Sequence, residues 1–161
     1  MKNKNGFTLL EVVISMGLLV ILITATVHIT RYTMVTNARL LAQSELFHQA
    51  TVAMEFISAH IDSAYAIRPS HDSIRIRRME HFPNRIDIQE NNIFFSSSNN
   101  RLNFSGAGNE FARYIQYFVI SKSNYLLYIT IVTTDRIENN SSIIEPITLN
   151  RAFDISNKNF F

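Results

Sequence analysis

One acidic residue, Glu11, lies inside an apolar stretch that is long enough to cross a membrane. An ionised carboxylate in hydrocarbon is costly unless it has a partner, and Phe7–Ile29 contains no Lys or Arg. Cleavage of the chain after Gly6 would supply a cation, because it would leave a free amino group on Phe7. Phe7 and Glu11 are four residues apart and share a helix face. Glu11 of one subunit would then be able to pair with the Phe7 amine of a neighbouring subunit and fix their relative register.

A simpler interpretation of Glu11 is that it lies at the level of the lipid headgroups and reaches water. The polar, basic stub that precedes Phe7 favours the pairing hypothesis, because removing this stub is what would create the amine.

Three arginines, Arg75, Arg77 and Arg78, form the densest basic cluster, with Arg68 and Arg85 nearby. Side chains alternate along a strand, so Arg75 and Arg77 are expected on one face. We interpret the cluster as a solvated face. The alternative is contact with nucleic-acid phosphates, although no accompanying aromatic array marks a platform for stacking bases.

The sequence offers no set of residues for catalysis or cofactor binding. Its five histidines are His28, His48, His60, His71 and His81. None has the paired spacing of a metal-binding helix, and no carboxylate set completes a site. An HExxH pattern, a GxSxG elbow and a glycine-rich phosphate loop are all absent, and so is Cys. We therefore expect no enzyme activity, no cofactor and no metal.

The apolar stretch is expected to begin a long helix. Phe7–Ile29 would span about 34 Å as a helix, enough for a hydrocarbon core of about 30 Å. The helical pattern then continues from Arg31 to Ile67 without Gly or Pro, and its apolar residues recur every seven positions. We expect Arg68–Pro69 to end the helix, because the residue before Pro disfavours helical torsions. The apolar seam consists of Phe47, Ala50, Met54, Ile57, Ile61 and Ala64.

The apolar stretch has a second interpretation, as a secretory signal peptide cut near Ile23–Ala25. The protein would then be a secreted or membrane-tethered binding domain. The length of the stretch, the presence of Glu11 and the helical continuation favour a retained membrane helix instead.

After Pro69 the apolar pattern becomes alternating, which indicates β-strands. The sequence therefore predicts an α+β fold in which the outer part of a long N-terminal helix packs through its seam against an antiparallel sheet. The expected strands are Ile74–Arg77, Ile86–Gln89, Ile93–Phe95, Leu102–Phe104, the hairpin Tyr114–Ile120 and Tyr125–Val132, an edge strand at Ile143–Leu149, and a short final strand at Asn159–Phe161.

The run Gly6-Phe7-Thr8-Leu9-Leu10-Glu11, between a short basic leader and the apolar stretch, resembles the N-terminal signature of type IV pilins and pseudopilins. The resemblance implies that a prepilin peptidase cleaves between Gly6 and Phe7 and N-methylates Phe7, which leaves the amine chargeable. The implied organisation is a leader at 1–6, a transmembrane and filament-core helix at 7–30, and a pilin-like head at 31–161, with an outer helix at 31–67 and a β-rich part at 70–161.

A weaker resemblance over Ala53–Ala64 is to W-type minor pilins and J-type minor pseudopilins. It implies a minor subunit that helps to initiate or cap a type IV pilus or a related secretion or competence pseudopilus. The implied partners are other pilin or pseudopilin subunits at the filament tip, the prepilin peptidase and the inner-membrane assembly platform. The implied location is the inner membrane, crossed once with the head on the periplasmic or extracellular side, and later the filament. A major pilin is the alternative.

Overall fold

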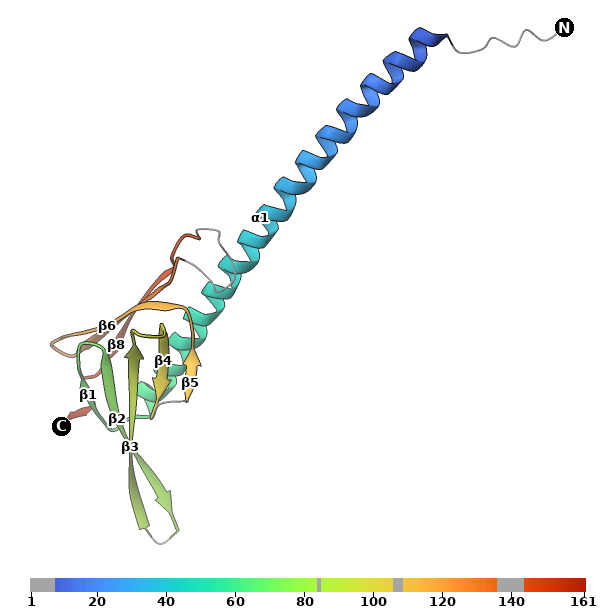
Figure 1. The fold of residues 1–161 in the computed structure, drawn as a ribbon. Helices are drawn as coiled ribbons and strands as arrows, with labels where there is room; N and C mark the ends of the chain where they lie inside the picture. The colour runs from blue at the N-terminus through green and yellow to red at the C-terminus, as the bar shows by residue number, and fades with distance from the viewer. Residues whose placement is uncertain (1–7, 84, 106–108, 136–143) are drawn as a thin grey trace. The chain divides into compact units, whose positions relative to one another are not determined.

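The computed structural model describes residues 8–83, 85–105, 109–135 and 144–161. These residues form one α-helix and two β-sheets (Figure 1). Helix α1 spans Leu9–Ser63. The chain divides into two compact units, Met1–Leu41 and Ala42–Phe161, and α1 contributes to both.

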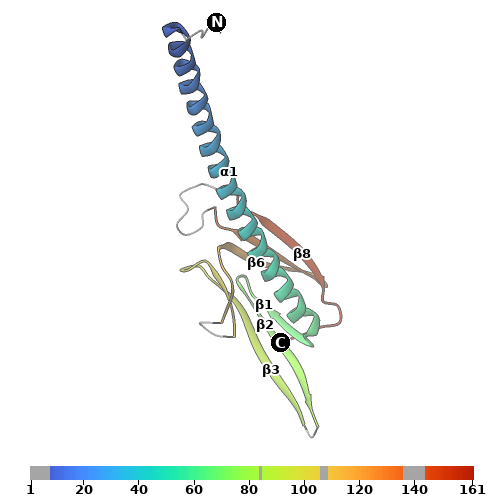
Figure 2. The same cartoon turned by 90° about the vertical axis from the view of Figure 1, so that its right-hand side faces the viewer.

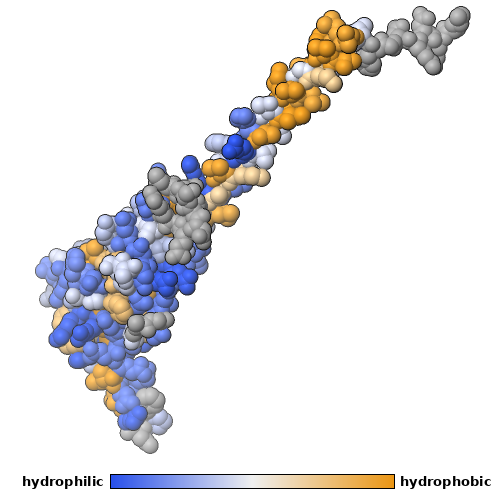
Figure 3. Space-filling model, in the orientation of Figure 1, coloured by the Kyte–Doolittle hydropathy of each residue, from blue (hydrophilic) through white to orange (hydrophobic). Residues whose placement is uncertain are grey.

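In the first unit, α1 exposes its side chains on every side. All residues from 8 to 41 are exposed except Thr36, which is half-buried. Apolar atoms dominate the first turns of this helix (Figure 3). Among the described residues, α1 is the one helix long and apolar enough to cross a membrane, by length and composition. Such a surface is stable in lipid or against other apolar surfaces, but not in water.

Most polar side chains in this apolar stretch are satisfied by the helix itself. The hydroxyls of Ser15, Thr24, Thr26 and Thr30 each donate to the carbonyl oxygen four residues earlier, at 2.7 to 2.9 Å. His28 Nδ1 lies 3.0 Å from the Thr24 carbonyl oxygen. These bonds pair polar groups that would be costly if they were left unpaired in hydrocarbon.

The second unit combines the end of α1 with two sheets (Figure 2). The larger sheet has the strand order β5-β4-β3-β2-β1-β9, and the smaller has the order β6-β7-β8. Pairing is antiparallel except between β1 and β9, which are parallel. The strands are β1 Ala66–Pro69, β2 Ser73–Phe82, β3 Arg85–Ser96, β4 Arg101–Phe104, β5 Glu110–Ala112, β6 Ile115–Ser123, β7 Leu126–Thr133, β8 Thr148–Asp154 and β9 Asn159–Phe160.

The core of the second unit lies between α1 and both sheets. Alternation along β2 places Ile74 and Ile76 inside, fully buried, while Arg75 is exposed. In β7, Ile129 and Ile131 are fully buried in the same way. The helix buries Ala42, Leu46, Ala50, Ala53, Met54, Ile57, Ser58 and Ile61. The predicted α+β fold, with the outer helix packed on antiparallel strands, is therefore confirmed, although the strands form two sheets instead of one.

The predicted end of the helix at Arg68–Pro69 is wrong. α1 ends at Ser63, and Ala66–Pro69 forms β1. Ala66 and Ile67 pair with β2 on one side and with β9 on the other, so sheet hydrogen bonds replace helical ones. The Lys158 ammonium donates to the carbonyl oxygens of Asp62 and Ala64, at 2.9 and 2.7 Å. These contacts satisfy carbonyl groups that the end of the helix leaves unpaired.

One member of the predicted seam, Phe47, is also wrong. Its side chain is 55% exposed, and its neighbour Leu46 is fully buried instead. A strict seven-residue repeat drifts by about 20° per heptad on a straight helix. The buried face here contains Leu46, Ala50, Ile57 and Ile61. Toward its start, this face includes Leu46 in place of Phe47, which the seven-residue repeat predicted.

Most predicted strands are confirmed, including the β6–β7 hairpin and the final strand β9. The edge strand predicted at Ile143–Leu149 is displaced: β8 begins at Thr148 and ends at Asp154. Pro146 has no N–H for a sheet hydrogen bond, so pairing begins after it. Ile143 lies outside the described residues.

Candidate functional site

Glu11 lies in the first turn of α1 and forms a reciprocal hydrogen-bond pair with Thr8. The Thr8 backbone N–H donates to Glu11 Oε2 at 3.0 Å, and the Thr8 hydroxyl donates to the same oxygen at 3.2 Å. The Glu11 backbone N–H donates to Thr8 Oγ1 at 3.3 Å. This arrangement is a capping box, which satisfies amide groups that have no partner within the helix. It explains why α1 begins at Leu9, directly after Thr8.

The carboxylate of Glu11 is therefore partly satisfied within its own helix. A negative charge in the first turn is also favoured by the helix dipole, by about 0.3–1 kcal/mol at an exposed position. Both bonds from Thr8 reach Oε2. No ion pair of Glu11 occurs within the described part of the chain. The described residues therefore give the Glu11 side chain hydrogen-bond donors but no cationic partner.

Thr8 is a residue of this site that the sequence analysis missed. Glu11 was assigned either to pairing with an amine or to the headgroup region, and neither hypothesis used Thr8. The signal was present as Thr8-Leu9-Leu10-Glu11, because a Thr three residues before a Glu and next to an apolar run is the capping-box pattern.

Gly6 and Phe7 lie outside the described residues. The cleavage between them and the methylation of Phe7 stay predictions, as does the pairing of Glu11 with the new amine.

In the second unit, the arginine cluster is divided between the two faces of β2. Arg75 and Arg77 share one face and also share one carboxylate, that of Glu90 on β3. Arg77 Nε lies 2.9 Å from Glu90 Oε2, and Arg75 Nη1 lies 3.9 Å from Glu90 Oε1. Strand alternation places Arg78 on the opposite face. The Arg77 guanidinium also lies 3.6 Å from the centroid of the Phe161 ring. The Glu90 carboxylate therefore neutralises part of the positive charge with which Arg75 and Arg77 would attract a phosphate.

We expect no measurable binding of double-stranded DNA by the full chain in detergent at about 50 mM salt, where phosphate contacts are strongest. The measurement is a titration of labelled DNA followed by fluorescence anisotropy. The control is the double variant Arg75→Gln/Arg77→Gln, whose anisotropy should stay as flat as that of the unchanged chain. Binding that weakens steeply with salt and is lost in the double variant would contradict the interpretation as a solvated face.

The histidines are distributed along the chain, and His60 has a packing role. Its ring centroid lies 4.2 Å from that of Phe56 and 4.6 Å from that of Phe104. His60 Nδ1 lies 2.8 Å from the Phe56 carbonyl oxygen. Among the described residues, no three His, Asp or Glu side chains come together as a metal-ligand set.

The comparison with protein families gives one match. Residues 1–27 match the family model of the prokaryotic N-terminal methylation motif. This match covers the predicted leader and cleavage site, the capping box and most of the apolar stretch. No curated protein and no solved structure matches the chain. The chain therefore carries the N-terminal signature of type IV pilins and pseudopilins.

Proposed function

We propose that the protein is a minor subunit of a type IV pilus or of a related secretion or competence pseudopilus, where it helps to initiate or cap assembly. The observation that carries the proposal is the methylation motif at residues 1–27, which contains the start of a helix whose apolar side chains are exposed throughout the first unit. A helix of this kind serves as a membrane anchor before assembly and as an apolar surface for neighbouring helices afterwards.

Processing is the first step of the proposed function. A prepilin peptidase cleaves between Gly6 and Phe7 and methylates the new amine. The leader 1–6 remains at the cytoplasmic face, while the second unit lies on the periplasmic or extracellular side. Proposed partners at this stage are the peptidase and the inner-membrane assembly platform.

Assembly is the second step, and Glu11 is its central residue. Before assembly, the capping box gives one oxygen of the carboxylate two hydrogen bonds from Thr8 at the start of the helix. Cleavage then creates a positive amine on Phe7 of each subunit. In the filament, Glu11 of the incoming subunit pairs with the amine of its neighbour, because each charge would otherwise be unpaired in an apolar core. The pair therefore favours one axial register over others.

The minor role is supported by the resemblance of Ala53–Ala64 to minor pilins and pseudopilins. In this chain, that segment carries the face that holds the second unit together, since Ala53, Met54, Ile57 and Ile61 are all buried in it. The partners of a minor subunit would be other pilin or pseudopilin subunits at the filament tip.

The mature protein is expected to begin at Phe7 with one added methyl group. Intact-mass measurement and N-terminal sequencing of the chain from a host with a pilus or secretion machine would check this. The control is Gly6→Val, which should remain uncleaved because the peptidase requires a small residue before the cut. A mature chain that begins near Thr26 would instead identify an ordinary signal peptide and reject the proposal.

A further inference from the structure

The hairpin formed by β2 and β3 extends beyond the rest of the larger sheet (Figure 1 and Figure 2). β1 pairs with β2 over Ile74–Arg77, and β4 pairs with β3 over Ile93–Ser96. Further out, among the described strands, Arg78–Phe82 and Arg85–Gln89 pair only with each other. We call these two segments the outer arm. A two-stranded ribbon has little stability of its own in water, so contact with a surface would stabilise it.

One face of the outer arm is apolar. Residues directly opposite each other in a hairpin lie on the same face. Met79 lies opposite Ile88, and His81 lies opposite Ile86. The side chains of Met79, Ile86 and Ile88 are 48%, 60% and 59% exposed, and Figure 3 shows apolar residues on the hairpin. Exposed apolar side chains that are clustered instead of scattered indicate a site of interaction.

The reverse face of the outer arm is polar. Glu80 lies opposite Asp87, and the Arg85 guanidinium lies 2.8 Å from the Asp87 carboxylate. Gln89 follows Ile88 in β3 and is exposed on this reverse face. The outer arm is therefore amphipathic, and only one of its faces is suited to contact with an apolar phase.

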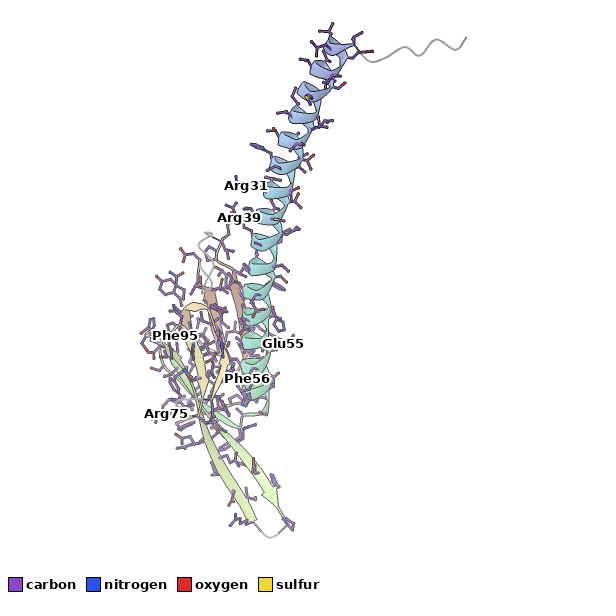
Figure 4. All side chains as sticks on the ribbon, turned by 45° about the vertical axis from the view of Figure 1, so that its right-hand side comes forward. Arg31, Arg39, Glu55, Phe56, Arg75 and Phe95 are labelled. Carbon is purple, nitrogen blue, oxygen red and sulfur yellow. The ribbon has the colours of Figure 1, made fainter. Side chains whose placement is uncertain are left out.

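The apolar face continues into a basic region of the larger sheet. β2 turns its two isoleucines into the core, so Arg75 and Arg77 share the face of Met79 and point away from α1. Figure 4 shows Arg75 extending on this side of the strands. Arg68 of β1 lies opposite Arg75 and adds a third positive charge. Arg75 and Arg77 share the single carboxylate of Glu90, so positive charge remains in excess in this region.

We propose that this face binds the surface of a membrane that contains anionic lipids. Met79, Ile86 and Ile88 enter the boundary between headgroups and acyl chains. Arg75 and Arg77 reach the lipid phosphates, with which guanidinium groups form paired hydrogen bonds. Amphipathic elements sink into this boundary by about 5–10 Å, and two residues along a strand span about 7 Å. The step from Met79 to Arg77 therefore matches the step from acyl chains to phosphates.

The combination of apolar and basic side chains on one face favours lipid over nucleic acid. Phosphates of nucleic acid would use the arginines but gain nothing from the exposed isoleucines. A bilayer with anionic lipids offers an apolar layer and a negatively charged layer next to each other, in the order in which Met79 and Arg77 occur along β2. This contact uses a different segment from the apolar stretch of α1, so the inference goes beyond the proposed function and does not depend on it.

The chain has no Trp, so one introduced Trp reports the surroundings of the outer arm without background. The full-length Ile88→Trp variant is held by α1 in nanodiscs of phosphatidylcholine. Vesicles of phosphatidylcholine and phosphatidylglycerol with brominated acyl chains are then added, because bromine quenches a Trp that enters their acyl region. We expect the Trp fluorescence to fall by about half or more. The matched control is Gln89→Trp on the reverse face, whose fluorescence should change little.

Two further changes separate the charged contact from the apolar one. In the Ile88→Trp chain, Arg75→Gln/Arg77→Gln should raise the vesicle concentration for half-maximal quenching by about tenfold or more, as should brominated vesicles without phosphatidylglycerol. Ile86→Ser should raise this concentration by about fivefold or more. All these positions are exposed or half-buried, and circular dichroism of each variant checks that its fold is retained.

No quenching of the Ile88→Trp variant would leave this face to a protein partner and overturn the inference. Equal quenching of the Gln89→Trp variant would also overturn it, as would quenching that ignores both the arginines and Ile86→Ser. None of these results would alter the start of the mature chain at Phe7, on which the proposed function is tested separately.

Discussion

Glu11→Gln is expected to remove the subunit from filaments while leaving its cleavage and its helix intact. Gln can occupy the last position of a capping box as Glu does, so the hydrogen bonds with Thr8 persist. The charge, however, is lost. An unpaired amine left in an apolar filament core costs about 3–5 kcal/mol, which corresponds to a loss in incorporation of about a hundredfold or more. The measurement is the ratio of mature subunit in sheared filaments to mature subunit in membranes.

Thr8→Ala is the matched control for the charge. It removes the hydroxyl that caps the Glu11 amide, at a cost of about 1 kcal/mol, but keeps the carboxylate. Incorporation should therefore fall by less than about tenfold, with the mature chain still beginning at Phe7. The opposite ranking, in which Thr8→Ala fails to assemble and Glu11→Gln assembles, would show that Glu11 acts as a helix cap and not as an ionic partner.

The start of the helix shows what a local pattern can predict. The apolar stretch, Glu11 and the preceding Gly6-Phe7 pair were sufficient to predict the pilin-type signature, because each is a property of neighbouring residues. The capping role of Thr8 was equally local and could have been predicted from the spacing of Thr8 and Glu11. Axial register is different, because it depends on a second molecule, and so the pairing of Glu11 was available only as a hypothesis.

The second unit shows where local patterns stop. Alternation in Ile74–Arg77 and the β-branched and aromatic residues of Tyr125–Val132 predicted strands correctly. In each strand, buried apolar side chains occur at every second position, as Ile74 and Ile76 do in β2. The end of the helix was mispredicted because Ala66 and Ile67 have helical neighbours in sequence but strand neighbours on both sides in space. The division into two sheets likewise depends on contacts between distant segments. Phe47 and Leu46 are adjacent apolar residues, and only the position of the sheets decides which of them is buried.

Ile57→Asp is expected to unfold the second unit. Ile57 is fully buried in the face that α1 presents to the sheets. The variant loses apolar contacts worth about 2–5 kcal/mol and also buries a carboxylate without a partner. Together these costs approach the whole stability of a domain, about 5–15 kcal/mol. Limited proteolysis and near-ultraviolet circular dichroism of the full chain in detergent would show the loss of ordered packing.

Phe47→Asp is the matched control, because Phe47 lies on the same helix with an exposed side chain. Its effect on the free energy of unfolding should stay within about 1 kcal/mol, as is usual for surface substitutions. Phe56 is unsuitable as a control although it neighbours Ile57, since its ring lies 4.3 Å from that of Phe111 and packs on Phe104. Unfolding by Phe47→Asp, or a folded Ile57→Asp variant, would contradict the burial of α1 through the face that contains Leu46 and Ile57.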